Sequence, residues 1–169
     1  MADNPANKLD SDDTAHLPDC GMYRTGAPLP GDPEHLPAGR LVYFHNHSQS
    51  GEPIVCCPED NTHNRWSFQE QGHRVSDPDF IAALTPLMPQ GLYVLKEHLH
   101  ISKTDILPER TLVQLGYDRE AMPILFPGRF AGNSIHFPES GLGFNSDTVF
   151  TNLEPVTFLV PDHGDRHLN

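Results

Sequence analysis

The residues best suited to chemistry are histidines, and six of the eleven lie between residues 45 and 100. Two His-x-His pairs occur there, His45-Asn46-His47 and His98-Leu99-His100. On a β-strand, residues i and i+2 point to the same side about 7 Å apart. Two imidazoles so placed can bind one metal ion, as they do in many β proteins that hold zinc, copper or iron. Each pair therefore predicts part of a metal site if a strand carries it.

The stretch around the first pair resembles a known metal-binding motif. Its spacing, Gly39-x5-His45-x-His47-x4-Glu52, is similar to the first half of the first cupin motif over 14 residues. The resemblance implies that the two histidines and the glutamate bind a metal ion, with a further histidine from a second motif. The chain departs from the cupin pattern at Glu59, which stands where cupins have glycine, and it has no counterpart of the second motif. Glu52 and the first histidine pair are therefore conditional ligands.

Two interpretations of these histidines stay open. In the first, the pairs end neighbouring strands and converge on a divalent transition metal (Zn, Fe, Cu or Mn). Other histidines or the cysteine thiolates then complete the site or compete for the metal. The candidate ligands are His45, His47, Glu52, His98 and His100. In the second, the histidines are ordinary surface side chains. The second pair shares a strand face with Lys96, and the apolar side chains of that strand occupy the other face, which favours exposure to solvent.

A polar loop at residues 58–64 is the predicted contact for a partner or ligand, because loops on a rigid sheet often carry binding. Its candidate binding residues are Glu59, Asp60, Asn61, His63 and Asn64. Other catalytic signatures are absent: the sequence has no phosphate-binding glycine loop and no Gly-x-Ser-x-Gly elbow. Cys56 and Cys57 lie in an apolar stretch, which is typical of buried structural thiols. The sequence therefore favours a non-enzymatic protein.

Composition narrows the classes of protein further. The 169 residues include 17 prolines and 13 glycines, which predicts one domain of short elements. No apolar run is long enough to span a membrane. The net charge of −12 disfavours nucleic acid and anionic membrane surfaces as partners. Three cysteines do not make a disulfide framework, and the N-terminus lacks the pattern of a secretory signal, so we expect a reduced, cytoplasmic protein.

The elements that position these residues are predicted from an internal repeat. A shift of 69 positions aligns residues 64–87 with 133–156 and gives six identities in 24 positions. The identical pairs are Asn64 and Asn133, Phe68 and Phe137, Glu70 and Glu139, Gly72 and Gly141, Leu84 and Leu153, and Pro86 and Pro155. The alternative is that two β-hairpin regions are similar by coincidence.

Each copy is predicted to be a β-β-β-α-β unit. The first two strands are expected at 41–46 and 53–57 in the first copy, and at 111–117 and 122–126 in the second. An alternating strand follows, and then a short helix capped by Ser76 or Asn145. The final strands are expected at 92–101 and 156–160.

The sequence thus predicts an α+β, mostly β fold of two tandem repeats packed about a pseudo-two-fold axis. Its parts are a flexible acidic, proline-rich tail (1–38) with an extended arm at 21–25, copy one (39–101), a linker (102–111), copy two (112–161) and a flexible C-terminal tail (162–169). The predicted function is that of a non-enzymatic binding or accessory module. Its expected partner is another protein or a further copy of the same chain, in a homo-oligomer. The alternatives are a metal-binding protein or cupin-like metalloenzyme that uses the histidine pairs, and small-molecule binding between the repeats.

Overall fold

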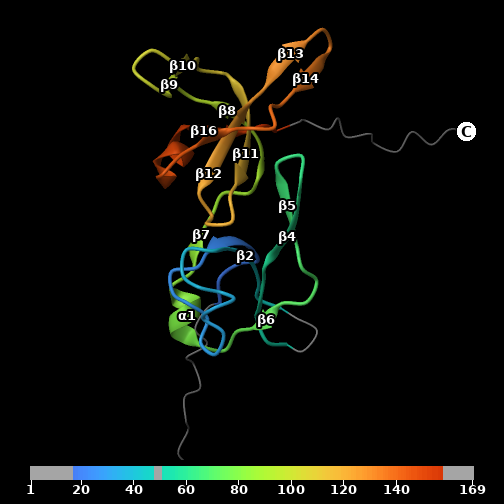
Figure 1. Ribbon diagram of the computed structural model, residues 1–169, viewed down its shortest axis with the longest axis vertical. Helices are drawn as coiled ribbons and strands as arrows, with labels where there is room; N and C mark the ends of the chain where they lie inside the picture. The colour runs from blue at the N-terminus through green and yellow to red at the C-terminus, as the bar shows by residue number, and fades with distance from the viewer. Residues whose placement is uncertain (1–16, 48–50, 158–169) are drawn as a thin grey trace, which may run out of the picture.

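The computed structural model describes residues 17–47 and 51–157 and confirms a mostly β protein. Two antiparallel sheets of five strands each follow one another along the long axis of the molecule (Figure 1). Three two-stranded hairpins and two short helices complete the part of the chain that is described. No helix in these residues is long and apolar enough to cross a membrane.

The first sheet is built from the N-terminal half of the chain. In sheet order its strands are β6 (His73–Arg74), β3 (Ile54–Cys56), β2 (Leu41–His45), β1 (Gly21–Arg24) and β7 (Thr85–Pro86). Helix α1 (Pro78–Ala82) covers one face through Phe80, which is buried with Val42 and Phe44 of β2. Each such side chain contributes about 1.5–3 kcal/mol by leaving water.

The second sheet is built from the C-terminal half. In sheet order its strands are β15 (Leu142–Gly143), β12 (Pro123–Pro127), β11 (Leu112–Tyr117), β8 (Gly91–Leu95) and β16 (Leu153–Pro155). A 3-10 helix, η1 (Asp147–Asn152), packs Val149 into the core of this sheet. Leu41 of the first sheet is buried in the same core, because successive residues of β2 point to opposite faces.

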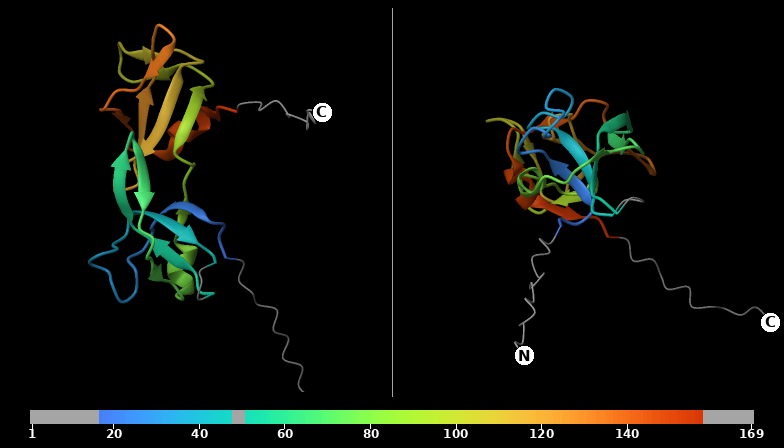
Figure 2. Two further views of the ribbon diagram at one scale, coloured as in Figure 1. Left: turned by 90° about the vertical axis from the view of Figure 1, so that its right-hand side faces the viewer. Right: turned by 90° about the horizontal axis from the view of Figure 1, so that it is seen from below.

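Three hairpins extend from the sheets. They are β4 (Pro58–Thr62) with β5 (Arg65–Phe68), β9 (Leu99–His100) with β10 (Ile106–Leu107), and β13 (Arg129–Ala131) with β14 (Ser134–His136). The β4–β5 hairpin runs from the first sheet to the second, whereas β13–β14 extends from the second sheet away from the first (Figures 1 and 2).

Several predicted elements differ from the structure. Residues 21–24 form β1 inside the first sheet, and Leu29 and Leu36 are buried in its core, so the ordered body begins well before residue 39. The strand expected to end the first copy, at 92–101, is divided: residues 92–95 belong to β8 of the second sheet, which pairs with β11 and β16, and residues 99–100 form β9 of a separate hairpin. Hydrophobic patterning identified the strand but not its partners, since pairing is a long-range property.

Both helix caps lie one residue later than predicted. The Asp77 carboxylate accepts a hydrogen bond from the Phe80 amide at 2.7 Å, so Asp77 and not Ser76 is the cap of α1. Pro78 is then the first helical residue. Ser146, not Asn145, caps η1. The predicted final strand at 156–160 lies partly outside the described residues, as do residues 1–16 and 162–169.

Candidate functional site

The β4–β5 hairpin docks on the outer face of the second sheet. Its two-residue turn, His63-Asn64, has positive φ at both positions (52° and 63°), the geometry of a tight hairpin that asparagine tolerates well. The Asn64 amide donates a hydrogen bond to Gln114 Oε1 at 3.1 Å, and Gln114 Nε2 donates to the His63 carbonyl at 2.7 Å. Gln114 on β11 is only 7% exposed, so these bonds satisfy a polar group that water scarcely reaches.

Two further contacts fix the hairpin. Trp66 Nε1 donates a hydrogen bond to the Tyr117 carbonyl at 2.7 Å. A Cβ on Gly116 would lie 2.8 Å from the Asn64 carbonyl oxygen, so the close approach of the turn to β11 depends on this glycine. The Tyr117 hydroxyl donates to the Met88 carbonyl at 2.7 Å, and burial raises the pKa of this phenol well above its usual value.

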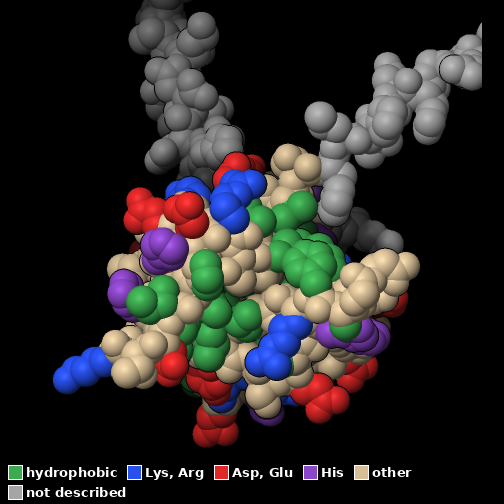
Figure 3. Space-filling view, turned by 90° about the horizontal axis from the view of Figure 1, so that it is seen from above, with side chains coloured by type: hydrophobic (Ala, Val, Ile, Leu, Met, Phe, Trp, Pro, Cys, Tyr) green, Lys and Arg blue, Asp and Glu red, His purple; other side chains and the backbone are tan. Residues whose placement is uncertain are grey.

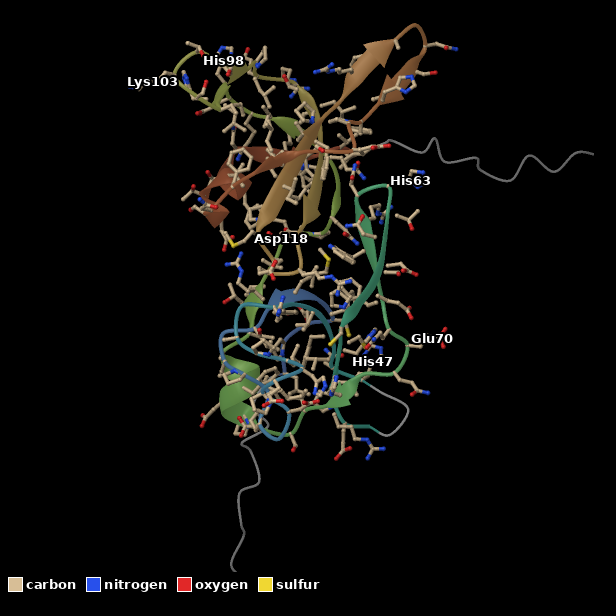
Figure 4. The ribbon with its side chains drawn as sticks, in the orientation of Figure 1. His47, His63, Glu70, His98, Lys103 and Asp118 are labelled. Carbon is tan, nitrogen blue, oxygen red and sulfur yellow. The ribbon has the colours of Figure 1, made fainter. Side chains whose placement is uncertain are left out.

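A groove of about 980 Å³ opens beside the docked hairpin. One wall is the hairpin with its turn, and another is formed by residues 135–139, which begin within β14. Trp66, Ile124 and Phe126 contribute apolar surface, while Asn61, His63 and Asn64 contribute polar groups. Figure 4 shows His63 at the hairpin turn and Asp118 at the end of β11, two of the residues that line the groove.

The charged groups of the groove are mostly acidic. Asp118, Glu120 and Glu139 line it together with one cation, Arg119. The Arg119 guanidinium lies 5.1 Å from the centre of the Trp66 ring, a cation–π distance, and so is held against the groove wall. The groove therefore combines an aromatic surface with carboxylate, amide and imidazole groups, which suits hydrogen bonding and stacking.

A second hollow, of about 580 Å³, is also lined by Trp66. Its walls include Met22, Tyr43 and Phe68, and the rings of Tyr43 and Phe68 lie 5.5 Å apart. Cys20 also lines it.

Comparison with known proteins gives no match: no family model, no curated protein and no solved structure is significantly similar to this chain.

The predicted metal ligands are not assembled into one site. His45 and His47 lie near each other, with ring centres 6.3 Å apart, but His47 and His98 lie toward opposite ends of the molecule (Figure 4). The second pair sits in the β9–β10 hairpin, and β9 does not neighbour β2. Glu52 forms an exposed ion pair with Arg74 at 3.2 Å. Within 17–47 and 51–157, no three His, Cys, Asp or Glu side chains are arranged to hold one metal ion.

The first histidine pair has other partners. The Asn46 Oδ1 accepts a hydrogen bond from the Cys20 thiol at 3.2 Å and lies 2.7 Å from His47 Nδ1. The His45 ring lies 4.6 Å from that of Tyr43. Because Nδ1 of His47 donates to the Asn46 oxygen, it is not free to accept the proton of Cys20, 3.5 Å away. The geometry therefore does not make Cys20 a nucleophile with His47 as its base.

The predicted binding loop is split by the structure. Three of its members, Asn61, His63 and Asn64, line the groove, whereas Glu59 and Asp60 lie outside it. The rest of the groove was missed, because apart from Trp66 its other residues lie about 50–75 positions beyond Asn64 in sequence. Gln114 carried the one usable signal: it is a lone polar residue in the apolar strand Leu112–Tyr117 and therefore requires a partner.

Proposed function

We propose that the protein is a binding module, and that the groove beside the β4–β5 hairpin takes an extended segment of a protein partner. The observation that carries the proposal is the groove itself, about 980 Å³ with an aromatic wall and hydrogen-bonding groups along it. Apolar surface with a few placed polar groups is the common composition of binding sites. Main-chain amides of a peptide can pair with Asn61 and Asn64, while an apolar side chain packs on Trp66.

The charges favour a basic segment. Three carboxylates line the groove, and its single guanidinium is engaged by the Trp66 ring. The chain as a whole has a net charge of −12, which speeds the approach of cationic partners. We therefore expect a partner with lysine or arginine next to an aromatic or aliphatic side chain.

Selection of peptides tests this proposal. A random-peptide library displayed on phage is panned against the immobilised full chain, and the enriched peptides are titrated while Trp66 fluorescence is recorded. Trp66 is the only tryptophan in the chain and lines the groove, so its emission should change when a peptide binds there. We expect enriched peptides to be basic and apolar, and to bind more weakly as salt is added.

A charge reversal supplies the matched control. Glu139→Lys, in the groove, should weaken binding about fivefold, the effect of losing one favourable surface charge contact and gaining an unfavourable one. Glu70→Lys makes the same change outside the groove and should leave the affinity unchanged. Enriched peptides that bind both variants as tightly as the natural chain would contradict the groove as the site.

We propose in addition that the chain contains two copies of one unit, with boundaries near 21–86 and 91–155. The strand orders support this: β6-β3-β2-β1-β7 corresponds, position by position, to β15-β12-β11-β8-β16. The hairpins match in register, since Asn61 is opposite Trp66 and Phe130 is opposite Ile135, each 69 residues later. Both hairpins extend from their own sheet in the same direction along the long axis (Figure 1), which favours a head-to-tail arrangement of the copies over the pseudo-two-fold packing predicted above.

A shared tyrosine contact supports the same boundaries. Tyr23 in Gly21-Met22-Tyr23 donates its hydroxyl to the carbonyl four residues earlier at 2.8 Å, and Tyr93 in Gly91-Leu92-Tyr93 does the same at 2.6 Å. Each tyrosine is paired with a proline of the last strand of its sheet. A crystal structure in which superposing the two units fails to bring Trp66 onto Ile135 would contradict the duplication.

A further inference from the structure

The β13–β14 hairpin exposes an apolar pair. All six strand residues are exposed, and Phe130 and Ile135 lie directly opposite each other, 74% and 44% exposed. Hydrophobic side chains gather on this end of the molecule, seen from above in Figure 3. An aromatic residue and a β-branched residue opposite one another on an open hairpin form a surface that favours association.

The corresponding hairpin of the first unit shows how such a surface is used. Trp66 and Asn61 occupy the positions of Ile135 and Phe130, 69 residues earlier. There the hairpin lies on the outer face of the next sheet, and Trp66 is partly buried with its indole bonded to the Tyr117 carbonyl. The second hairpin has the same form, but it extends beyond the last sheet of the chain (Figure 1).

The first sheet offers a matching face. On β11 the residues beneath the docked hairpin are Gln114 and Gly116. The strand pairings make Tyr43 and His45 of β2 their counterparts. Tyr23 is opposite Val42 as Tyr93 is opposite Val113, so the next residue of each strand, Tyr43 or Gln114, occupies the same position. Both counterparts are only partly buried, and Tyr43 lines the 580 Å³ hollow.

We propose that the chain associates head to tail, with the β13–β14 hairpin of one copy docked on the Tyr43 face of a second copy. Phe130 enters the 580 Å³ hollow, whose walls include Met22, Tyr43 and Phe68. This inference rests on the proposed duplication and not on peptide binding in the groove; of the apolar pair Ile135 lines the groove and Phe130 does not. The contact is heterologous, so it forms open chains of copies unless the rotation between them closes a ring.

The affinity of this association follows from the surface area that the contact buries. A hairpin of this length buries much less than the roughly 1,200 Å² of a stable interface, so association belongs to the weak class. Sedimentation equilibrium of the full chain under reducing conditions, from about 5 μM to about 500 μM, covers this range. The weight-average mass should rise with concentration above the 18.8 kDa of one chain.

Two aspartate variants locate the contact. Phe130→Asp should hold the mass at that of one chain throughout, whereas Ile106→Asp, on the exposed β9–β10 hairpin, should associate as the natural chain does. A natural chain that stays at 18.8 kDa overturns the proposal. Association that survives Phe130→Asp, or that both variants abolish, overturns it as well. None of these results depends on whether peptides bind the groove.

Cross-linking tests the receiving face. Ala131→Cys places a thiol on the hairpin, and Cys20 lies in the wall of the hollow. A short bismaleimide should join the two in covalent dimers that are lost in the Cys20→Ser background and kept in the Cys57→Ser background. Dimers that form equally without Cys20 would show a different receiving surface and overturn the proposed face.

Discussion

Replacing Gln114 by leucine should loosen the β4–β5 hairpin while keeping the volume of the side chain. The variant loses two hydrogen bonds, of 3.1 and 2.7 Å, that join β11 to the hairpin turn. Each is worth about 0.5–1.5 kcal/mol, so the free energy of unfolding should fall by about 2 kcal/mol. For a chain of this size the melting temperature should drop by about 4–8 °C.

Trp66 makes the local effect visible. It lies on β5 and is the only tryptophan, so thermal unfolding followed by its fluorescence reports on the docked hairpin. In Gln114→Leu the native emission should shift to longer wavelength as water reaches the indole. Gln71→Leu, an exposed position outside the groove, is the control and should change neither signal. If Gln114→Leu keeps the stability and emission of the natural chain, the two hydrogen bonds do not hold the hairpin and the reasoning fails.

Three other predictions use the same unfolding assay. Gly116→Ala should cost about 1–3 kcal/mol, because its Cβ would lie 2.8 Å from a carbonyl oxygen of the hairpin turn; an unchanged midpoint would contradict that approach. Arg24→Ala should cost about 2 kcal/mol, since Arg24 of β1 joins the first sheet to η1 by hydrogen bonds of 3.0 and 2.7 Å to Asp147. A loss below about 0.5 kcal/mol would mean that the pair contributes no more than an ordinary surface salt bridge. The hydrogen bond from His35 lowers the pKa of Asp32, so this carboxylate stabilises the fold above pH 3.8, and that contribution is lost as the pH falls below it. Asp32→Asn should therefore lose less stability than the natural chain on acidification, and equal losses would refute the assignment.

The strands were predictable wherever their own residues determine them. Apolar runs and alternation identified β2, β3, β11 and β12 to within two residues. Residues 21–25 were expected as an extended arm of the tail and not as a strand of the sheet, because the segment is short and lies among prolines, and its place comes from pairing with β2 and β7. Residues 92–95 were identified as a strand but assigned to the wrong neighbours, since no local pattern says which sheet a strand joins.

The same limit applies to the candidate site. The spacing of His45 and His47 correctly places their rings near each other, but spacing carries no information on how far away His98 lies. The polarity of residues 58–64 identified one wall of the groove. The other wall comes from β11, β12 and the segment 135–139, which only the docking of a hairpin across two sheets brings to the same place.

Strand β2 has a consequence for how the molecule comes apart. Its Val42 and Phe44 belong to the core of the first sheet, while Leu41 belongs to the core of the second. Melting the first half therefore removes Leu41 from the core of the second half, and heat should produce one cooperative transition instead of two. A chain of two similar halves is usually free to lose one of them. Here the first half supplies part of the interior of the second, so the second half depends on the first for its own core.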